Sequence, residues 1–266
     1  MDTLIYYFTA TGNSFFVAKE LVSNMENAQM LPIIKAIRRE NFKADAHKIG
    51  FVFPLYYGGM PPIVESFIKT LDITTDSYIF AVVTRGVSKG RVKSQLRSAL
   101  QHKGVELSYL RYITMPANYI RMYNIKEEKV NENIIKKAIP HINDTATDII
   151  NNSISIEDGR SVEKLFYKIA YGVWKRSLRR KDNNFKLNDK CTSCGICENI
   201  CPANNIIILD GTPKWLHKCA DCMACIHVCP NNAIDIGKRT VKRRRYRNPY
   251  VDIKDIIEQK RTLNTQ

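Results

Sequence analysis

All eight cysteines of this chain fall into two copies of one spacing pattern, which constrains the fold more than any other feature of the sequence. Each copy reads C-x2-C-x2-C-x3-C-P, and each cysteine of the second copy lies 28 residues after its counterpart. This spacing gathers three thiols in one tight loop, and the proline stops the chain from continuing as a regular helix or ladder. The copies are Cys191, Cys194, Cys197, Cys201 and Pro202, then Cys219, Cys222, Cys225, Cys229 and Pro230.

The pattern resembles that of bacterial ferredoxins with two [4Fe–4S] clusters, in which the fourth cysteine of each run ligates the other cluster. Gly195, next to Cys194, lets the backbone pass close to inorganic sulfur. Zinc and disulfides are the alternatives, because pairs of C-x2-C units also occur in zinc sites and disulfides occur in secreted proteins. Two complete runs favour clusters. The resemblance implies one cluster on Cys191, Cys194, Cys197 and Cys229 and a second on Cys219, Cys222, Cys225 and Cys201.

Length and composition predict one large or two modest domains in a cytoplasmic protein. The chain has 266 residues, of which 44% are hydrophobic, enough for an ordinary core. No apolar run approaches about 18 residues and the N-terminus has no basic leader, so we expect neither a membrane span nor a signal peptide. The net charge of +15 is spread along the chain, which argues against one nucleic-acid-binding stripe.

Short apolar runs alternate with helical patterns over the first 120 residues, which predicts a doubly wound α/β fold with five parallel strands. The expected strands are 4–8, 30–34, 48–53, 78–84 and 109–115. Helices are expected at 13–25, 62–71 and 89–102. Beyond the sheet, helical segments are expected at 126–139 and 140–152, with Pro140 breaking or kinking the pattern.

After an α/β domain over 1–155, composition divides the chain into three further parts. A basic amphipathic linker helix over 156–182 is followed by a small α+β cysteine domain over 183–240. Residues 241–266 form a basic tail that we expect on the surface. The linker helix has one apolar face, formed by Val162, Leu165, Phe166, Ile169 and Val173.

A loop rich in hydroxyl groups, residues 9–14 (TATGNS), follows the first predicted strand. Ligands of doubly wound sheets bind outside the carboxyl ends of the strands. Backbone N–H groups, hydroxyls and a helix N-terminus suit a phosphate monoester. The chain has no G-x4-G-K-[ST] pattern, so we do not expect a nucleoside triphosphatase. A plain helix cap is the alternative, because Ser or Asn is common before a helix.

This loop resembles the T-x-T-G-N-[ST] phosphate loop of flavodoxins, which implies one noncovalent FMN. Two further loops resemble the flavodoxin loops on either side of the flavin ring, and the segment after the last strand adds candidate contacts; packing at strand ends is the alternative. The phosphate would lie on Thr9, Thr11, Gly12, Asn13 and Ser14. The ring would contact Pro54, Leu55, Tyr56, Tyr57, Gly58, Thr84, Arg85, Gly86, Asn118 and Tyr119.

Over its full length the chain resembles the flavodoxin–ferredoxin fusions of anaerobic bacteria called EFR1-family ferredoxins. Residues 115–119 (MPANY) and 245–249 (RYRNP) also resemble that family. The fold implied is a flavodoxin-like five-stranded parallel sheet followed by a bacterial-ferredoxin-like domain. Two features depart from it. Asn205 replaces a usual alanine, and positive charge stands where flavodoxins are acidic, at Arg85, Lys89, Arg91 and Lys93.

The function implied by the resemblance is electron transfer between FMN and two [4Fe–4S] clusters. Clusters pass single electrons and FMN holds one or two, so the pair would couple one- and two-electron carriers. We expect no catalytic side chain, and we expect redox partners with acidic docking surfaces rather than nucleic acid or a membrane. Two alternatives stay open: a flavin-dependent reductase of a small substrate, and a redox-sensing nucleic-acid binder that uses residues 243–247.

Overall fold

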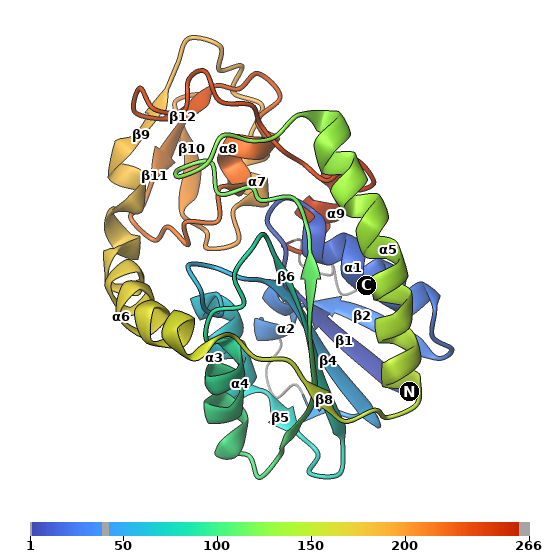
Figure 1. Cartoon of the computed structure of the whole chain (residues 1–266). Helices are drawn as coiled ribbons and strands as arrows, with labels where there is room; N and C mark the ends of the chain where they lie inside the picture. Colours follow the sequence, from blue (N-terminus) through green and yellow to red (C-terminus); the bar gives the residue numbers. More distant parts are fainter. Residues whose placement is uncertain (1, 39–42, 261–266) are drawn as a thin grey trace, which may run out of the picture.

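The computed structural model describes residues 2–38 and 43–260. Residues 1, 39–42 and 261–266 lie outside this description, and with them small parts of the predicted 1–155 domain and 241–266 tail. The N-terminal half is built on a parallel sheet of order β2-β1-β4-β6-β7-β8 (Figure 1). Its strands are β1 (Thr3–Tyr7), β2 (Ala28–Pro32), β4 (Lys48–Pro54), β6 (Tyr78–Arg85), β7 (Leu107–Thr114) and β8 (Ser155–Ile156).

The five predicted strands are all present, and the order of β2, β1, β4, β6 and β7 is the flavodoxin-like one. The predicted fold class is therefore confirmed. The sixth strand, β8, was not predicted, because a strand of two residues carries no periodic signal. A small separate parallel pair joins β3 (Lys43–Ala44) to β5 (Asp72–Ile73).

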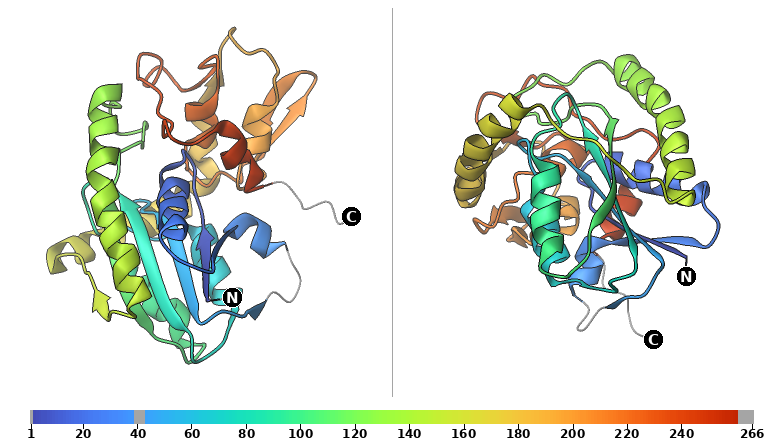
Figure 2. Two further views of the ribbon diagram at one scale, coloured as in Figure 1. Left: turned by 90° about the vertical axis from the view of Figure 1, so that its right-hand side faces the viewer. Right: turned by 60° about the horizontal axis from the view of Figure 1, so that its bottom comes forward.

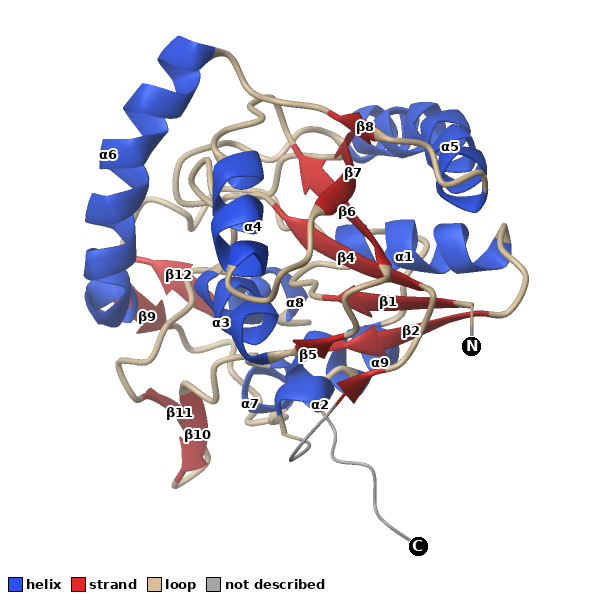
Figure 3. Cartoon of the chain, turned by 90° about the horizontal axis from the view of Figure 1, so that it is seen from below, coloured by secondary structure: helices blue, strands red, loops and turns tan. Residues whose placement is uncertain are grey.

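Helices cover both faces of the sheet (Figure 3). On one face, Leu21 and Ile142 pack in one core with Val52 and Val82 of the strands. On the other, Val64 and Leu96 belong to the core that contains the alternate strand residues. The first face carries α1 (Asn13–Ser23) and α5 (Glu128–Ile150), and the second carries α2 (Ile33–Ile37), α3 (Pro62–Thr70) and α4 (Val92–Gln101).

The helix α5 continues through Pro140, where the sequence predicts two segments with a break or kink between them. Proline removes one backbone hydrogen bond from a helix interior. Here Ile135, Ile142 and Ile149, on both sides of Pro140, are buried in one core. Burial of this continuous apolar face offsets the lost hydrogen bond.

The cysteine domain lies over the carboxyl end of the sheet (Figure 1), where Ile200, Ala224 and Val228 join the same core as α1 and α5. Two antiparallel pairs frame the domain, the hairpin β10–β11 and the pair β9–β12. Its elements are β9 (Phe185–Leu187), α7 (Ile196–Ile200), β10 (Ile206–Leu209), β11 (Thr212–Trp215), α8 (Ala224–Val228) and β12 (Ile234–Ile236).

Two segments connect the domains. The helix α6 (Ser161–Ser177) and the 3-10 helix η1 (Leu178–Asn184) run along the outer side of the molecule into the cysteine domain (Figure 1). After β12 the chain returns to the sheet and ends its described part in α9 (Ile253–Glu258), which lies near α1 and α2 (Figures 1 and 2). No helix within residues 2–38 and 43–260 is long and apolar enough to cross a membrane.

Candidate functional site

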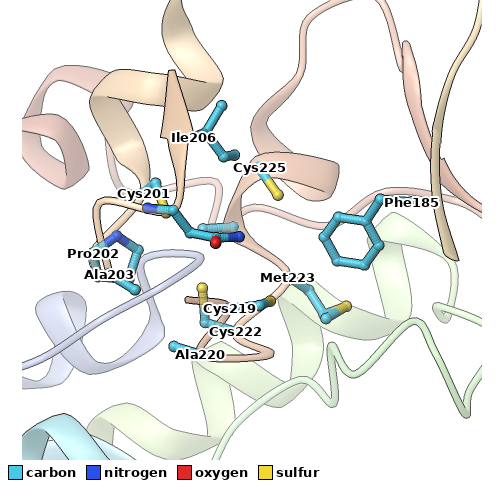
Figure 4. Close-up of a pocket in the computed structure, with 12 residues that line it drawn as sticks. Phe185, Cys201, Pro202, Ala203, Ile206, Cys219, Ala220, Cys222, Met223 and Cys225 are labelled. Carbon is cyan, nitrogen blue, oxygen red and sulfur yellow. The ribbon is translucent and has the colours of Figure 1, made fainter. Parts of the chain in front are cut away.

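The structure gathers the eight cysteines around two hollows in the cysteine domain. One hollow is lined by Phe185, Ile206 and Met223 together with four of the cysteines (Figure 4). The other is lined by Ile208, Pro213 and Ile234 with the remaining four. The first hollow has Cys201, Cys219, Cys222 and Cys225, and the second has Cys191, Cys194, Cys197 and Cys229.

Each hollow therefore holds three cysteines of one run and the fourth cysteine of the other run. These are the same two sets of four residues that the ferredoxin resemblance implies. Crossed sharing follows from the fold, because α7 and α8 pack against each other and bring the end of each run to the loop of its neighbour. That the two sets bind iron–sulfur clusters stays a prediction.

The 28-residue repeat of the sequence is also a repeat of the backbone. Gly195 begins α7 with φ 74°, and at the matching place Met223 begins α8 with φ 63°. Ser193 and Asp221, also 28 residues apart, have φ 55° and 53°. Left-handed residues at these positions turn each loop tightly, so that successive cysteines face the same hollow.

Backbone amides point at the sulfur atoms of both hollows. The N–H groups of Asn205 and Ala233 donate to Sγ of Cys201 and Cys229 at N–S distances of 3.3 and 3.2 Å. Amide donors to a thiolate stabilise its negative charge, and in iron–sulfur proteins they raise the reduction potential of the cluster. The arrangement thus suits thiolate ligands better than free thiols.

Burial, in contrast, disfavours the thiolate form of the free cysteines and so raises their pKa. Desolvation raises the pKa of Cys197 to about 11 and that of Cys219 to about 12. Ligand thiolates must lose their protons before they bind metal, so a positively charged metal centre has to offset this cost. Among the described residues, no group of three or more His, Cys, Asp or Glu side chains is arranged around a single metal ion.

Asp221, between two predicted cluster ligands, joins the cysteine domain to the sheet domain. Its buried carboxylate accepts hydrogen bonds from the hydroxyl of Tyr119 at 2.5 Å and from Nε1 of Trp174 at 2.9 Å. It also forms an ion pair with Arg121, whose Nη2 lies 3.0 Å away. No sequence pattern predicts this role of Asp221, whose only signal is an acidic residue between two cysteines.

Asn205, the departure from the usual alanine, is part of a second buried network. Its Nδ2 donates to Oδ2 of Asp182 at 2.9 Å, and its Oδ1 accepts the amide of Lys218. Asp182 also accepts the backbone amide of His217 at 3.1 Å. Asn205 therefore connects η1, β10 and the second cysteine run. It lines the hollow of Cys201, Cys219, Cys222 and Cys225, and these four cysteines remain grouped around it.

The predicted phosphate loop lies at the end of β1, with its side chains buried. Gly12 has φ 97° and its amide donates to Oγ1 of Thr9 at 3.1 Å. The hydroxyls of Ser14 and Thr84 lie 2.8 Å apart, and Nδ2 of Asn118 donates to Oγ1 of Thr11 at 2.5 Å. The structure thus brings Thr84 and Asn118, which were predicted to contact the flavin ring, to the predicted phosphate loop.

The C-terminal segment, residues 246–259, covers this loop. The Tyr246 hydroxyl and Nδ2 of Asn248 donate to Oδ1 of Asn13 at 2.6 and 3.2 Å. Nε2 of Gln259 donates to the carbonyl oxygen of Thr9 at 2.9 Å. A Cβ placed on Gly12 would lie only 3.1 Å from Cβ of Val251. The segment therefore packs directly on the predicted phosphate loop.

Three of the residues predicted to contact a flavin ring, Tyr56, Tyr57 and Gly58, pack against α6. The ring of Tyr57 stacks on Trp174, with centroids 5.7 Å apart and planes inclined by 6°. A Cβ on Gly58 would lie 2.1 Å from the ring of Tyr167, so only glycine allows this approach. Burial, followed by the nearby charges of Cys222 and Asp221, raises the pKa of Tyr56.

The predicted FMN contacts thus pack against other parts of the chain. The loop hydroxyls are paired with protein groups, the C-terminal segment packs on the predicted phosphate loop, and α6 packs on Tyr57 and Gly58. FMN binding stays a prediction. The loop residues 54–58 and 84–86 flank this carboxyl edge of the sheet, as predicted from β4 and β6.

The positive charge predicted beside the flavin is partly neutralised. Nζ of Lys89 lies 2.8 Å from Oε2 of Glu157, and Nζ of Lys93 lies 3.4 Å from Oδ2 of Asp158. The guanidinium of Arg85 donates to the carbonyl oxygen of Val87. These acidic partners just after β8 carried no signal in the sequence, because they lie more than 60 residues from the lysines.

Comparison with known proteins finds one family profile and several solved structures that are similar to parts of this chain. Residues 190–234 match the family profile of the 4Fe-4S dicluster domain. The Fusobacterium nucleatum flavodoxin solved with flavin mononucleotide is 16% identical over 57% of this chain and 99% of that chain, with a TM-score of 0.39. For two-electron reduced Megasphaera elsdenii flavodoxin the values are 13%, 55%, 98% and 0.33. No curated protein matches this chain.

With TM-scores below 0.5, these two structures add no argument about this chain, whose flavodoxin-like character is shown by its own strand order. The match to the dicluster domain includes all eight cysteines. The chain thus joins a flavodoxin-like α/β domain to a 4Fe-4S dicluster domain, and the predicted fusion is confirmed. Membership of the EFR1 family stays a prediction.

Proposed function

We propose that this protein is an electron carrier that holds two [4Fe–4S] clusters in its cysteine domain. The observation that carries the proposal is the crossed grouping of the cysteines, three from one run and one from the other around each hollow. Four thiolates at each hollow are the full ligand set of one such cluster. The first set, Cys191, Cys194 and Cys197, would be completed by Cys229, and the second set, Cys219, Cys222 and Cys225, by Cys201.

The clusters supply one-electron transfer, and the residues of this chain provide their surroundings. The amides of Asn205 and Ala233 stabilise ligand sulfurs, while the apolar side chains Phe185, Ile206 and Met223 limit contact of one hollow with water. Asp221 places a negative charge beside the second set and so favours the oxidised form there. No acid–base or nucleophilic side chain is needed.

We propose FMN as the second redox group, on the basis of the residues of the phosphate loop. In the described arrangement the C-terminal segment covers this loop, so coupling of FMN to the clusters depends on its displacement. The partners we propose are redox proteins with acidic docking surfaces, as the basic surface of the chain favours association with them.

Cofactor analysis of anaerobically purified protein tests this proposal. We expect about eight iron and eight sulfide per chain, with one-electron steps in a redox titration that account for two clusters. Stoichiometric zinc without iron would contradict the electron-transfer proposal. Two clusters without any flavin, even after incubation with excess FMN, would leave the cluster part standing and contradict the FMN part.

A further inference from the structure

The helix α6 exposes a continuous apolar stripe, here called the outer face, formed by Val162, Leu165, Phe166, Ile169 and Val173. Each of these side chains is 61 to 84% exposed. Single exposed apolar residues are common on protein surfaces, but five of them at i, i+3, i+4, i+7 and i+11 form one contiguous patch. Figure 1 shows α6 on the outer side of the molecule.

The exposure of the outer face does not result from loose attachment of the helix. The opposite side of α6 is buried, with Tyr171 and Trp174 only 4 and 3% exposed. The Tyr171 hydroxyl donates to the carbonyl oxygen of Met60 at 2.6 Å, and the Trp174 ring stacks on Tyr57. The helix is therefore a fixed platform that presents one apolar face to the molecule and another to the outside.

Positive charge borders the outer face. Exposed basic side chains lie along and beyond α6, and five of them form no ion pair with another described residue. A surface of this kind matches a partner whose contact area has an apolar centre and an acidic rim. A second copy of the chain fits poorly, because two basic rims would face each other. The five are Arg160, Lys168, Arg176, Arg179 and Arg180.

The inner side of α6 reaches the second cysteine set. Nε1 of Trp174 donates to Asp221 at 2.9 Å, and the amide of Asp221 in turn donates to Sγ of Cys219 at 3.3 Å. Val173 of the outer face is the chain neighbour of Trp174. A redox partner on the outer face would thus be separated from a cluster ligand by one helix. Such a short path serves a partner that exchanges electrons, which a membrane surface does not.

From these observations we propose that the outer face of α6 docks an acidic redox protein that exchanges electrons with the second cluster. This inference rests on the proposed function. One electron leaves the reduced partner and enters the oxidised cluster, and no bond is made or broken. The predicted basic patch at Arg85–Lys93 is the weaker candidate, because Glu157 and Asp158 pair with two of its lysines.

The test measures how fast a reduced, acidic bacterial ferredoxin reduces the clusters of the anaerobically reconstituted full chain at low salt. We expect Phe166→Ser with Ile169→Ser, and separately Arg179→Glu with Arg180→Glu, to lower the second-order rate constant at least about tenfold. Dithionite, a small reductant that needs no docking, should reduce all variants at the rate of the unmodified protein.

Two controls match these variants. Lys129→Glu with Lys137→Glu makes the same change in charge on exposed positions of α5, and Val87→Ser removes an exposed apolar side chain from a loop. Both should leave the ferredoxin rate unchanged. Equal rates for all variants would overturn the inference while the clusters, still reduced by dithionite, uphold the proposed function.

Two other occupants of the outer face would give different results. Sedimentation of the protein with vesicles containing phosphatidylserine, lost in Phe166→Ser with Ile169→Ser while ferredoxin rates stay unchanged, would overturn the inference in favour of a membrane surface. A dimer in light scattering that becomes a monomer in the same variant, again without a change in rate, would overturn it in favour of a second copy.

Discussion

The backbone amide of Asn248 donates a hydrogen bond to the carbonyl oxygen of Thr11, with N and O 2.8 Å apart. This contact ties the C-terminal segment to the loop in which a flavodoxin-like sheet is predicted to hold phosphate. Asn248 is fully buried there, as is Ile256 of α9. The loop is therefore part of a packed interface, and any ligand of the loop competes with residues of the same chain.

From this competition we predict that loosening the C-terminal segment strengthens FMN binding. Val251 touches the position above Gly12, and Gln259 makes two hydrogen bonds to Thr9. Replacing both, as Val251→Ala with Gln259→Ala, raises the fraction of molecules with an open loop, and apparent affinity follows that fraction. We expect a dissociation constant lower by about tenfold in a titration followed by flavin fluorescence.

The control for this titration is Lys254→Ala, a change on the exposed side of α9 that should leave FMN affinity as in the unmodified protein. Equal affinity in all three proteins, or no FMN binding by any of them, would contradict competition between FMN and the segment.

A comparison of two glycines predicts how tightly the segment packs on the loop. Both Gly12 and Gly104 have positive φ, 97° and 68°, but only at Gly12 would an added Cβ meet other atoms, Cβ of Asn248 at 3.0 Å among them. Alanine at either position strains the backbone by about 1–2 kcal/mol. At Gly12 overpacking adds about 1–3 kcal/mol.

Thermal unfolding of Gly12→Ala and Gly104→Ala, both handled anaerobically, checks this prediction. The midpoint should fall further for Gly12→Ala. An equal loss in both variants would mean that the segment does not rest on Gly12 in solution.

The sequence predicted most of what short-range patterns encode. Each cysteine run determines three ligand positions through local spacing, and buried strands such as β6 show as continuous apolar runs. What escaped prediction depends on contacts between distant segments. Nothing local to Asn248 indicates that it meets Thr11, and nothing local to Glu157 indicates that it pairs with Lys89.

The helix α6 illustrates a further limit of sequence patterns. Helical spacing correctly predicted that Val162 to Val173 share one apolar face, but spacing cannot tell whether such a face is covered. In the structure Tyr171 and Trp174 are the buried residues, because aromatic side chains on that side reach Tyr57 and Asp221. The predicted amphipathic helix is thus present with its buried side on the other face.

The buried charge of Asp221 predicts an effect on one cluster potential. Asp221→Asn keeps an oxygen that accepts from Tyr119 and Trp174, but it removes a negative charge next to Cys222 and leaves Arg121 without its ionic partner. Both changes favour the more negative, reduced state of the cluster. We expect the potential of one cluster to rise, on the order of tens of millivolts, in a redox titration.

The control for Asp221→Asn is Asp189→Asn. This variant removes an exposed carboxylate near the first cysteine run, where solvent screens the charge. Its two potentials should stay close to those of the unmodified protein. A potential that falls in Asp221→Asn, or that is unchanged in it, would show that this carboxylate does not act on a cluster.

The most direct test of the crossed ligand sets is the iron and sulfide content of reconstituted double variants. Cys201→Ala alone should reduce the content from about eight iron to about four. Adding Cys225→Ala, which affects the same predicted cluster, should leave about four, whereas adding Cys197→Ala should leave almost none. The reverse result, about four iron with Cys197→Ala and almost none with Cys225→Ala, would show that each run holds its own cluster and would contradict the account.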